Sequence, residues 1–224
     1  MKKLFIAILS MACSISISAQ TSLSEEEVEQ AKKRAAEKVS IFTGYVKDIG
    51  EKNESLKSRL YYCQEALNLF VGKGDSYTET YYEDSTPRVV KRKGVQMQVT
   101  SLRDKSKKTP YLLKKYLNNL ANLRYSKVEI ETTEVAHMKI GNLYKVGDNT
   151  YKCTCFFKQA FIGYKDGKPV YKDITEKKVD CYIFVEDILG GATEHMVQLG
   201  DVTALETQSM SGNSVIDVLD ILNQ

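Results

Sequence analysis

The sequence predicts an α+β domain in which N-terminal helices pack on the concave face of a curled, mainly antiparallel sheet. The first observation is a long hairpin over residues 151–186, whose two arms meet at Asp166-Gly167, a dipeptide suited to a tight turn. The second is the helical spacing of apolar residues in the first third of the chain. Strands as long as these twist and curl, and a curled sheet normally carries a helix on its concave side.

The first 19 residues indicate an export signal. Lys2 and Lys3 precede an apolar run, and small residues precede Gln20. We therefore expect an exported protein that works in the periplasm or outside the cell, with its net charge lowered from +3 to +1 by loss of the two lysines. A lipoprotein with an anchor on Cys13 is less favoured, because Leu9 stands one place too early for that motif.

The remainder is expected to form one α+β domain over residues 20–206, followed over 207–224 by a linker and a short C-terminal helix. The helix, residues 214–224, has apolar residues around most of its circumference and should dock on its own domain, which predicts a monomer. Exchange of this helix with a second copy is the alternative. No later apolar run approaches the ~20 residues of a membrane-spanning helix.

Two helices are expected first. Ser24 and Glu27 form a capping box, and a stripe of apolar residues continues to Gly50. The second helix begins near Asn53 and ends before Gly72. Its expected buried stripe is Leu56, Leu60, Cys63, Leu67 and Phe70.

The next elements alternate between strands and turns. The polar, tyrosine-rich residues 75–87 indicate a loop, and residues 94–102 alternate as a half-buried strand. A charged turn should then lead to a third helix that starts at Thr109-Pro110 and buries Leu117. Further strands are expected from residue 128, in the hairpin, and over residues 194–206, where Gly200-Asp201 forms a bulge.

This order of elements resembles the nuclear transport factor 2-like (cystatin-like) superfamily over about residues 24–206. The segments 116–123 and 125–130 are similar to segments of exported proteins of unassigned function from Bacteroides-like bacteria. The resemblance implies a curled sheet with helices in its concave face. None of the superfamily's catalytic motifs falls on residues of this chain, so the resemblance implies no activity.

Three cysteines of the hairpin are candidates for a disulfide: Cys153, Cys155 and Cys181. A two-residue turn at Asp166-Gly167 sets Cys153 opposite Asp180, and a single β-bulge would bring Cys181 into register instead. The alternative is that these residues and Cys63 are buried thiols that act as small hydrophobes. A zinc site is not expected, because the spacing lacks the usual C-x₂₋₄-C pair.

Asp180 and Tyr182 are a candidate pocket pair, because both project from one face of a strand. Ketosteroid isomerase, in the resembled superfamily, uses a carboxylate with a hydrogen-bond donor in an apolar pocket. A solvated outer face is the competing interpretation. Glu129, Glu131 and Asp173 are other strand positions where a pocket acid could sit. No motif surrounds His137 or His195, and no metal or cofactor is expected.

A basic stretch is a candidate surface for polyanions or anionic lipid headgroups. Export removes most nucleic acid from reach, so no nucleic-acid partner is expected. A solvated face is the competing interpretation, and the acidic segment 75–84 could fold over the stretch. Its members are Arg88, Lys91, Arg92, Lys93, Arg103, Lys105, Lys107 and Lys108.

The function that these observations favour is a non-catalytic binding or interaction domain of the cell envelope, with an envelope protein or a small ligand as partner. One alternative is a small-molecule enzyme that uses a pocket between the sheet and the helices. The other is a structural component that assembles through its C-terminal helix. An inward acid and tyrosine in a large pocket would favour ligand chemistry, and an exposed apolar patch over a filled core would favour a protein partner.

Overall fold

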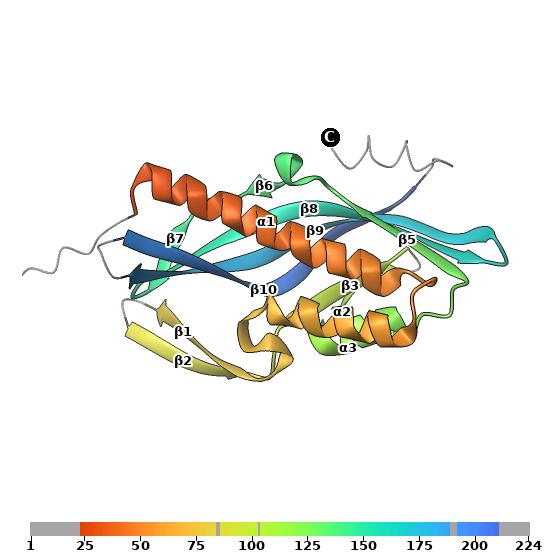
Figure 1. Ribbon diagram of the computed structural model, residues 1–224, viewed down its shortest axis with the longest axis horizontal. Coiled ribbons are helices and arrows are strands. Elements are labelled where there is room, and N and C mark those ends of the chain that lie inside the picture. Colours follow the sequence, from red (N-terminus) through yellow and green to blue (C-terminus); the bar gives the residue numbers. More distant parts are fainter. Residues whose placement is uncertain (1–22, 84–85, 103, 189–191, 211–224) are drawn as a thin grey trace, which may run out of the picture.

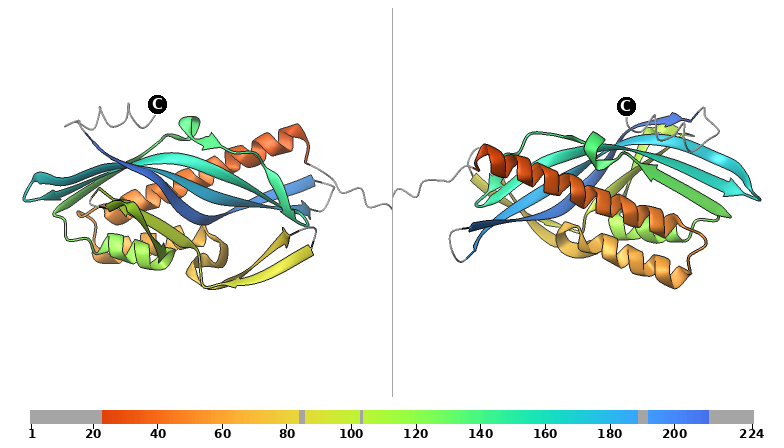
Figure 2. Two further views of the ribbon diagram at one scale, coloured as in Figure 1. Left: turned by 180° about the vertical axis from the view of Figure 1, so that it is seen from behind. Right: turned by 45° about the horizontal axis from the view of Figure 1, so that its top comes forward.

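The computed structural model describes residues 23–83, 86–102, 104–188 and 192–210. Within these ranges, α1 (Glu25–Gly50), α2 (Leu56–Asn68) and α3 (Leu113–Ala121) cover one face of a large sheet. Short 3₁₀ turns lie at Val71–Gly74, after α2, and at Val135–His137, after strand β5 (Lys127–Thr132). The predicted α+β class, with helices packed on a curled sheet, is confirmed (Figures 1 and 2).

The large sheet is antiparallel except for one pairing. Its main path is β4-β3-β10-β9-β8-β5, and β10 lies parallel to β3 beside Met97. The strands on this path are β3 (Gln96–Ser101), β4 (Asp104–Leu112), β5 (Lys127–Thr132), β8 (Thr150–Lys165), β9 (Lys168–Ile188) and β10 (Ala192–Ser209). Two short strands, β6 (Lys139–Ile140) and β7 (Tyr144–Gly147), also pair with β8.

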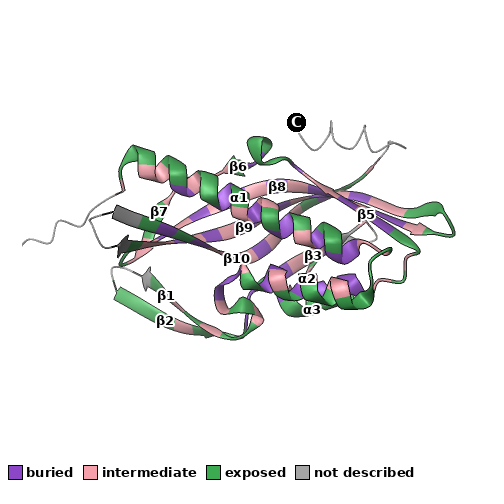
Figure 3. Cartoon of the chain, in the orientation of Figure 1, coloured by how far each residue is buried: buried purple, intermediate pink, exposed green. Residues whose placement is uncertain are grey.

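Helix α1 forms where the sequence predicts it. The Ser24 backbone N–H donates to Glu27 Oε2 at 2.8 Å, and Glu27 N–H donates back to Ser24 Oγ at 3.3 Å, which completes the capping box. The face of α1 towards the sheet is buried (Figure 3). Phe42 is 1% exposed, and its ring meets that of Phe70 edge-to-face at 4.8 Å between centroids. The main core therefore lies between the helices and the sheet.

Helix α2 buries less of its predicted stripe than expected. Cys63, Leu67 and Phe70 are buried, but Leu56 and Leu60 are 46% and 42% exposed. The burial begins at the later turns of the helix, so the first turns extend beyond the elements that cover it. The prediction that Leu60 belongs to the core is therefore wrong.

Residues 75–87 are not the loop that the sequence suggested. Most of them form a separate antiparallel hairpin of β1 (Tyr77–Glu83) and β2 (Thr86–Arg92), with Tyr77 opposite Arg92. Tyrosine, threonine and valine favour extended backbone. Polar residues on both faces remove the alternation that would have revealed the strands, so the prediction failed.

The third helix begins later than predicted, at Leu113. The expected charged turn and Thr109-Pro110 instead belong to β4, in which Pro110 lies opposite Gln98 of β3. Strand β4 is the edge of the sheet, where proline is tolerated because one side of the strand needs no N–H donor. Leu113, Leu117 and Leu120 are buried as predicted.

The long hairpin of β8 and β9 contains both the predicted turn and a bulge. Asp166 and Gly167 adopt positive φ angles of 52° and 74°, as a two-residue hairpin loop requires. Tyr164 lies opposite Pro169 but Gly163 lies opposite Tyr171, so Val170 is the extra residue. The bulge shifts the register by one and places Cys153 directly opposite Cys181.

Strand β10 carries the predicted irregularity, a register shift between Leu199 and Val202. It continues to Ser209, beyond the expected end at residue 206, and Thr207 is buried. The predicted C-terminal helix over residues 214–224 lies outside the described residues, as does the predicted export signal. Among the described helices, none is long and apolar enough to span a membrane.

Candidate functional site

A cavity of about 490 Å³ lies between the sheet and α3. Its floor is formed by strands β3, β8 and β9, and α3 covers it with Tyr116, Asn119 and Leu120. Aromatic rings from several elements make up much of its wall, and ring contacts join some of them. These rings are Tyr111, Tyr116, Tyr125, Phe161 and Tyr171.

The aromatic wall depends on a close approach at Gly163. The Tyr125 ring packs on β8 there, and a Cβ atom at Gly163 would lie 2.7 Å from ring atoms. The Phe161 ring has its centroid 5.9 Å from that of Tyr125 and 5.9 Å from that of Tyr171. Glycine at this position therefore allows three consecutive rings to line one side of the cavity.

Strand β9 supplies the polar groups of the cavity floor. Asp173, Thr175 and Lys177 alternate along the strand on the same face as Val179 and Cys181, which continue it under the helices. The exposed fractions of Asp173 and Lys177 are 6% and 7%. Two ionisable side chains are thus buried on this face, and their burial needs compensation by hydrogen bonds or a ligand.

Lys177 is held by one neighbour. Its Nζ donates to Gln159 Oε1 at 2.5 Å, and Gln159 is itself 7% exposed. Burial lowers the pKa of the Lys177 amine to about 8, against the opposing effect of the Asp173 charge. An ammonium has three N–H donors, and among the described residues Lys177 Nζ makes no hydrogen bond other than that to Gln159. The cavity side of the amine is therefore able to meet a ligand oxygen.

Asp173 is held by a tyrosine. Tyr171 Oη donates to Asp173 Oδ2 at 2.5 Å and accepts from the Leu102 backbone N–H at 3.3 Å. Burial raises the pKa of Asp173, and the Tyr171 hydrogen bond and the Lys177 charge offset only part of that rise. The Tyr171 pKa is raised in turn, first by burial and then by the carboxylate. The pair is a carboxyl and phenol in a largely apolar surrounding.

Asp173 and Lys177 are separated along β9. Residues four apart on a strand have Cα atoms about 13 Å apart, at about 3.3 Å per residue. In the described part of the chain, no ion pair within 4.0 Å includes Lys177. Threonine hydroxyls lie between and beside them, with Thr175 and Thr207 Oγ1 atoms 3.0 Å apart and Thr100 also hydrogen-bonded to Thr207.

A further polar atom of the cavity has no partner. Gln98 Oε1 is buried, lines the cavity, and makes no hydrogen bond within the ranges that the structure describes. A buried acceptor without a donor costs free energy, about 1–3 kcal/mol. The cavity thus combines aromatic walls with an unpartnered acceptor, a partly satisfied amine and a carboxyl, which suits a small ligand with polar ends.

Sequence reasoning identified one of these groups. Asp173 was among three acids considered for a pocket, and it lines the cavity. The other two acids lie in ion pairs, Glu129 with Lys127 at 2.5 Å and Glu131 with Lys47 at 2.8 Å. Lys177, Gln159 and Tyr171 were missed. The available signal was the parity of Asp173 and Lys177, which continues the apolar face of Val179, Cys181 and Ile183.

The candidate pair Asp180 and Tyr182 projects from the opposite face of β9. Asp180 Oδ2 accepts from Lys152 Nζ at 2.8 Å, and Tyr182 Oη donates to Glu79 Oε1 at 2.7 Å. Tyr182 and Glu79 line a separate cavity of about 460 Å³ beside the β1-β2 hairpin, and Asp180 is not part of its lining. The structure therefore places this pair outside the cavity under α3.

The basic stretch is divided between two sheets. Arg88, Lys91 and Arg92 lie on β2, Lys93 follows it, and Lys108 lies on β4. Residue 103 lies outside the described residues, and of Lys105 and Lys107 only the backbone, in β4, is described. Two ion pairs connect acidic residues before and within β1 with basic ones, Glu79–Arg92 at 2.8 Å and Asp75–Lys114 at 3.9 Å. The acidic segment thus meets basic side chains at both of these points.

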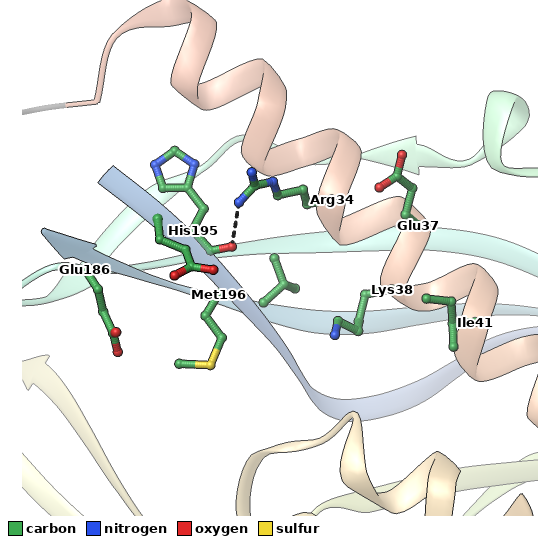
Figure 4. A pocket seen from close by; sticks show the side chains of 9 residues that line it. Arg34, Glu37, Lys38, Ile41, Glu186, His195 and Met196 are labelled. Atoms are coloured by element: carbon green, nitrogen blue, oxygen red, sulfur yellow. Dashed lines mark hydrogen bonds between the residues drawn. The ribbon is translucent and has the colours of Figure 1, made fainter. Parts of the chain in front are cut away.

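A third cavity, of about 370 Å³, lies between α1 and the adjoining ends of β9 and β10 (Figure 4). Arg34 reaches across from α1, and its Nη1 donates to the His195 carbonyl oxygen at 2.9 Å. His195 is 6% exposed, and its Nε2 has no hydrogen-bond partner in the described ranges. The residues that line it include the exposed carboxylates Glu186 and Glu194.

The remaining predicted groups do not converge. His137 is exposed in a 3₁₀ turn and is not among the residues that line the cavity under α3. Cys153, Cys155 and Cys181 are free and buried. Within the described residues, no three histidine, cysteine or acidic side chains are placed to hold a metal ion.

Fold and cavity together define an α+β protein with a pocket of aromatic and polar side chains under its third helix. No family model matches the chain, and no curated protein matches it. A solved structure from Novosphingobium aromaticivorans, provisionally assigned as a scytalone dehydratase, is similar over 84% of this chain and 94% of that chain. Its sequence identity is 9% and its TM-score is 0.39, a level of similarity that says nothing about activity.

Proposed function

We propose that this protein binds a small molecule in the cavity under α3, and that the ligand has an apolar, ring-sized body and an acceptor oxygen such as a carboxylate. The observation that carries the proposal is Lys177, a buried amine with one hydrogen-bond partner, in a cavity walled by aromatic rings. The volume of about 490 Å³ falls within the range of about 300–1,000 Å³ that is typical of ligand pockets.

The ligand chemistry follows from the two ends of the cavity. A carboxylate at Lys177 would accept N–H donors that Gln159 leaves available and would favour the charged amine. A hydroxyl or N–H at the other end would find an acceptor at Asp173, and Gln98 Oε1 offers a further acceptor in the cavity lining. The rings of Tyr116, Tyr125 and Phe161 line the cavity and suit contact with a flat apolar body.

A small-molecule enzyme is the second candidate, and it would use the same cavity. The favouring observation is that the Lys177 pKa is lowered to about 8 while the Asp173 pKa is raised, because both groups are buried. Ionisable groups whose pKa values are shifted towards neutral pH are able to exchange protons with a bound molecule. Ligand binding is the part that both candidates require, so it is the part to test first.

The test is calorimetric titration with a series of substituted benzoates and cinnamates, each paired with the neutral alcohol of the same shape. We expect saturable binding of some acids and at least about tenfold weaker binding to Lys177→Met, equal to about 1.4 kcal/mol. Lys38→Met, at the third cavity, is the matched control and should bind like the unaltered chain. Equal affinity in Lys177→Met, or no saturable binding across the series, would contradict the proposal.

Proton uptake gives the titration a second readout. The free amine has a pKa of about 8, so it is mostly neutral at pH 9. A bound carboxylate raises that pKa, and the complex should therefore take up a proton at pH 9 but not at pH 6. The heat of binding in two buffers of different ionisation enthalpy measures this uptake, and Lys177→Met should show none.

We also propose that the chain is exported and acts in the periplasm or outside the cell, as the composition of residues 1–19 predicts. Intact-mass measurement of the protein from the envelope fraction of the cells that make it should give a chain beginning at Gln20. A chain that retains Met1, or a lipid-modified Cys13, would contradict this.

A further inference from the structure

We propose that Lys177 is a carbonyl-reactive amine that forms an imine with an aldehyde or ketone bound in the cavity under α3. This rests on the proposed function, and it narrows the ligand class to molecules with an aromatic or apolar body and a carbonyl group. It also gives the buried lysine a covalent role that binding alone does not require.

Lys177 lines the cavity and has no ion-pair partner among the described residues. It lines the cavity from the centre of the sheet, and Gln159 Oε1 holds Nζ in place at 2.5 Å. Gln159 is uncharged, and the carboxylate nearest in sequence on that face, Asp173, forms no ion pair with Lys177 within 4.0 Å among the described residues. No charged partner in the described ranges therefore holds the amine in its protonated form.

The charged and titratable groups around Lys177 come from several elements. Strand β9 contributes Asp173 and Tyr171, β4 contributes Tyr111, α3 contributes Tyr116, and Tyr125 precedes β5. The fully buried lysine has a pKa of about 8, because its desolvation outweighs the attraction of Asp173. Near pH 7, each unit of pKa changes the neutral fraction about tenfold, so Lys177 has roughly two hundred times the free amine of an ordinary lysine with a pKa of about 10.4.

The reaction balances with no further reagent. The lone pair of neutral Nζ attacks the carbonyl carbon, and the C=O π electrons move to oxygen, which gains a proton. Loss of the hydroxyl as water, with the second amine proton, leaves a C=N bond between Nζ and the former carbonyl carbon. One amine and one carbonyl compound thus give one imine and one water, and nothing is oxidised or reduced.

Lys152 provides a matched comparison on the same hairpin. Its side chain is 18% exposed, but its Nζ lies 2.8 Å from Asp180 Oδ2 and 5.0 Å from the centroid of the Tyr182 ring. Burial favours its neutral form, yet the Asp180 hydrogen bond and charge raise the Lys152 pKa overall. A partly buried lysine with a carboxylate partner should therefore stay charged and unreactive.

The experiment is reductive trapping of the full chain with benzaldehyde and sodium cyanoborohydride at pH 7, followed by intact-mass measurement and peptide mapping. We expect one benzyl group on Lys177, formed at least about a hundredfold faster than on Lys152. Lys177→Met should lose this adduct, and Lys152→Met should keep it. A benzoate that binds the cavity should slow trapping in proportion to its occupancy.

The outcomes separate the two proposals. If the acids bind in a Lys177-dependent way but Lys177 is not trapped, the imine proposal is wrong and the binding proposal stands. If labelling spreads over exposed lysines and Lys177→Met leaves it unchanged, the imine proposal is also overturned. Trapping at Lys177 without carboxylate binding would support the carbonyl class and contradict the acid as the ligand.

Discussion

Lys177→Met is expected to stabilise the protein at neutral pH while it weakens binding of the acids at least about tenfold. Keeping Lys177 charged when the pKa falls from 10.5 to about 8 costs about 3 kcal/mol, at 1.36 kcal/mol per pKa unit. Methionine removes that cost and fills similar volume, but it leaves Gln159 Oε1 without its donor, at a cost of about 1–3 kcal/mol. The variant should therefore gain up to about 2 kcal/mol in unfolding free energy at pH 7.

The stability difference between the two proteins should depend on pH. The folded-state pKa of Lys177 is below the unfolded value, so the unfolded chain binds more protons between about pH 8 and pH 10.5. The unaltered chain therefore gains stability, relative to Lys177→Met, as pH rises through that window. The difference should change by about 3 kcal/mol and reverse in sign, because only the hydrogen bond to Gln159 then remains.

Urea denaturation of both proteins between pH 7 and pH 11 measures this difference, in which shared titrations cancel. Lys152→Met is the matched control, since that lysine is paired with Asp180 and its pKa is raised. It should lose stability at pH 7. If the difference in unfolding free energy between the unaltered chain and Lys177→Met stays constant from pH 7 to pH 11, the pKa of Lys177 is not lowered by burial.

Oxidation is expected to join Cys153 and Cys181 and to stabilise the fold by about 3–4 kcal/mol, the chain-entropy value for a closed loop of this length. The two residues are direct partners across β8 and β9, and they are an opposed pair whose Cα atoms are about 5.5 Å apart in such ladders, within the disulfide range. Interaction between the two thiols lowers the pKa of Cys153 and raises that of Cys181.

Denaturation of the chain before and after mild oxidation, with mass analysis of alkylated peptides, checks this result. Cys155→Ala should still gain the cross-link, because Cys155 lies opposite Val179 rather than a cysteine. Cys153→Ala and Cys181→Ala should gain neither the cross-link nor the stability. Oxidation that links Cys155 instead, or that leaves all thiols free to alkylate after unfolding, would contradict the pairing.

The elements with strong local signals were predictable from sequence. The capping box at Ser24, the Asp166-Gly167 turn and the bulge near Gly200 are local chemical patterns, and each appears in the structure. The β1-β2 hairpin and the extended β4 were missed because their residues are polar on both faces or contain Pro110, and their strand form depends on pairing partners elsewhere in the chain.

The site was harder to predict because it depends on which helix covers each position along β9. Asp180 and Tyr182 share a strand with Asp173 and Lys177, yet the two pairs face opposite sides. Parity distinguishes these sides, but it does not show that α3 leaves an open volume over Asp173 while α1 closes over Cys181. That difference comes from the length and placement of α3, which the sequence pattern placed only approximately.

The most direct test of the account is an NMR titration of lysine ¹³Cε signals in the full chain, with and without a bound benzoate. One signal, absent in Lys177→Met, should titrate with a midpoint near 8, and ligand should move that midpoint upward. If every lysine titrates near its ordinary value of about 10.4, and no signal responds to any ligand of the series, the cavity under α3 is not the binding site described.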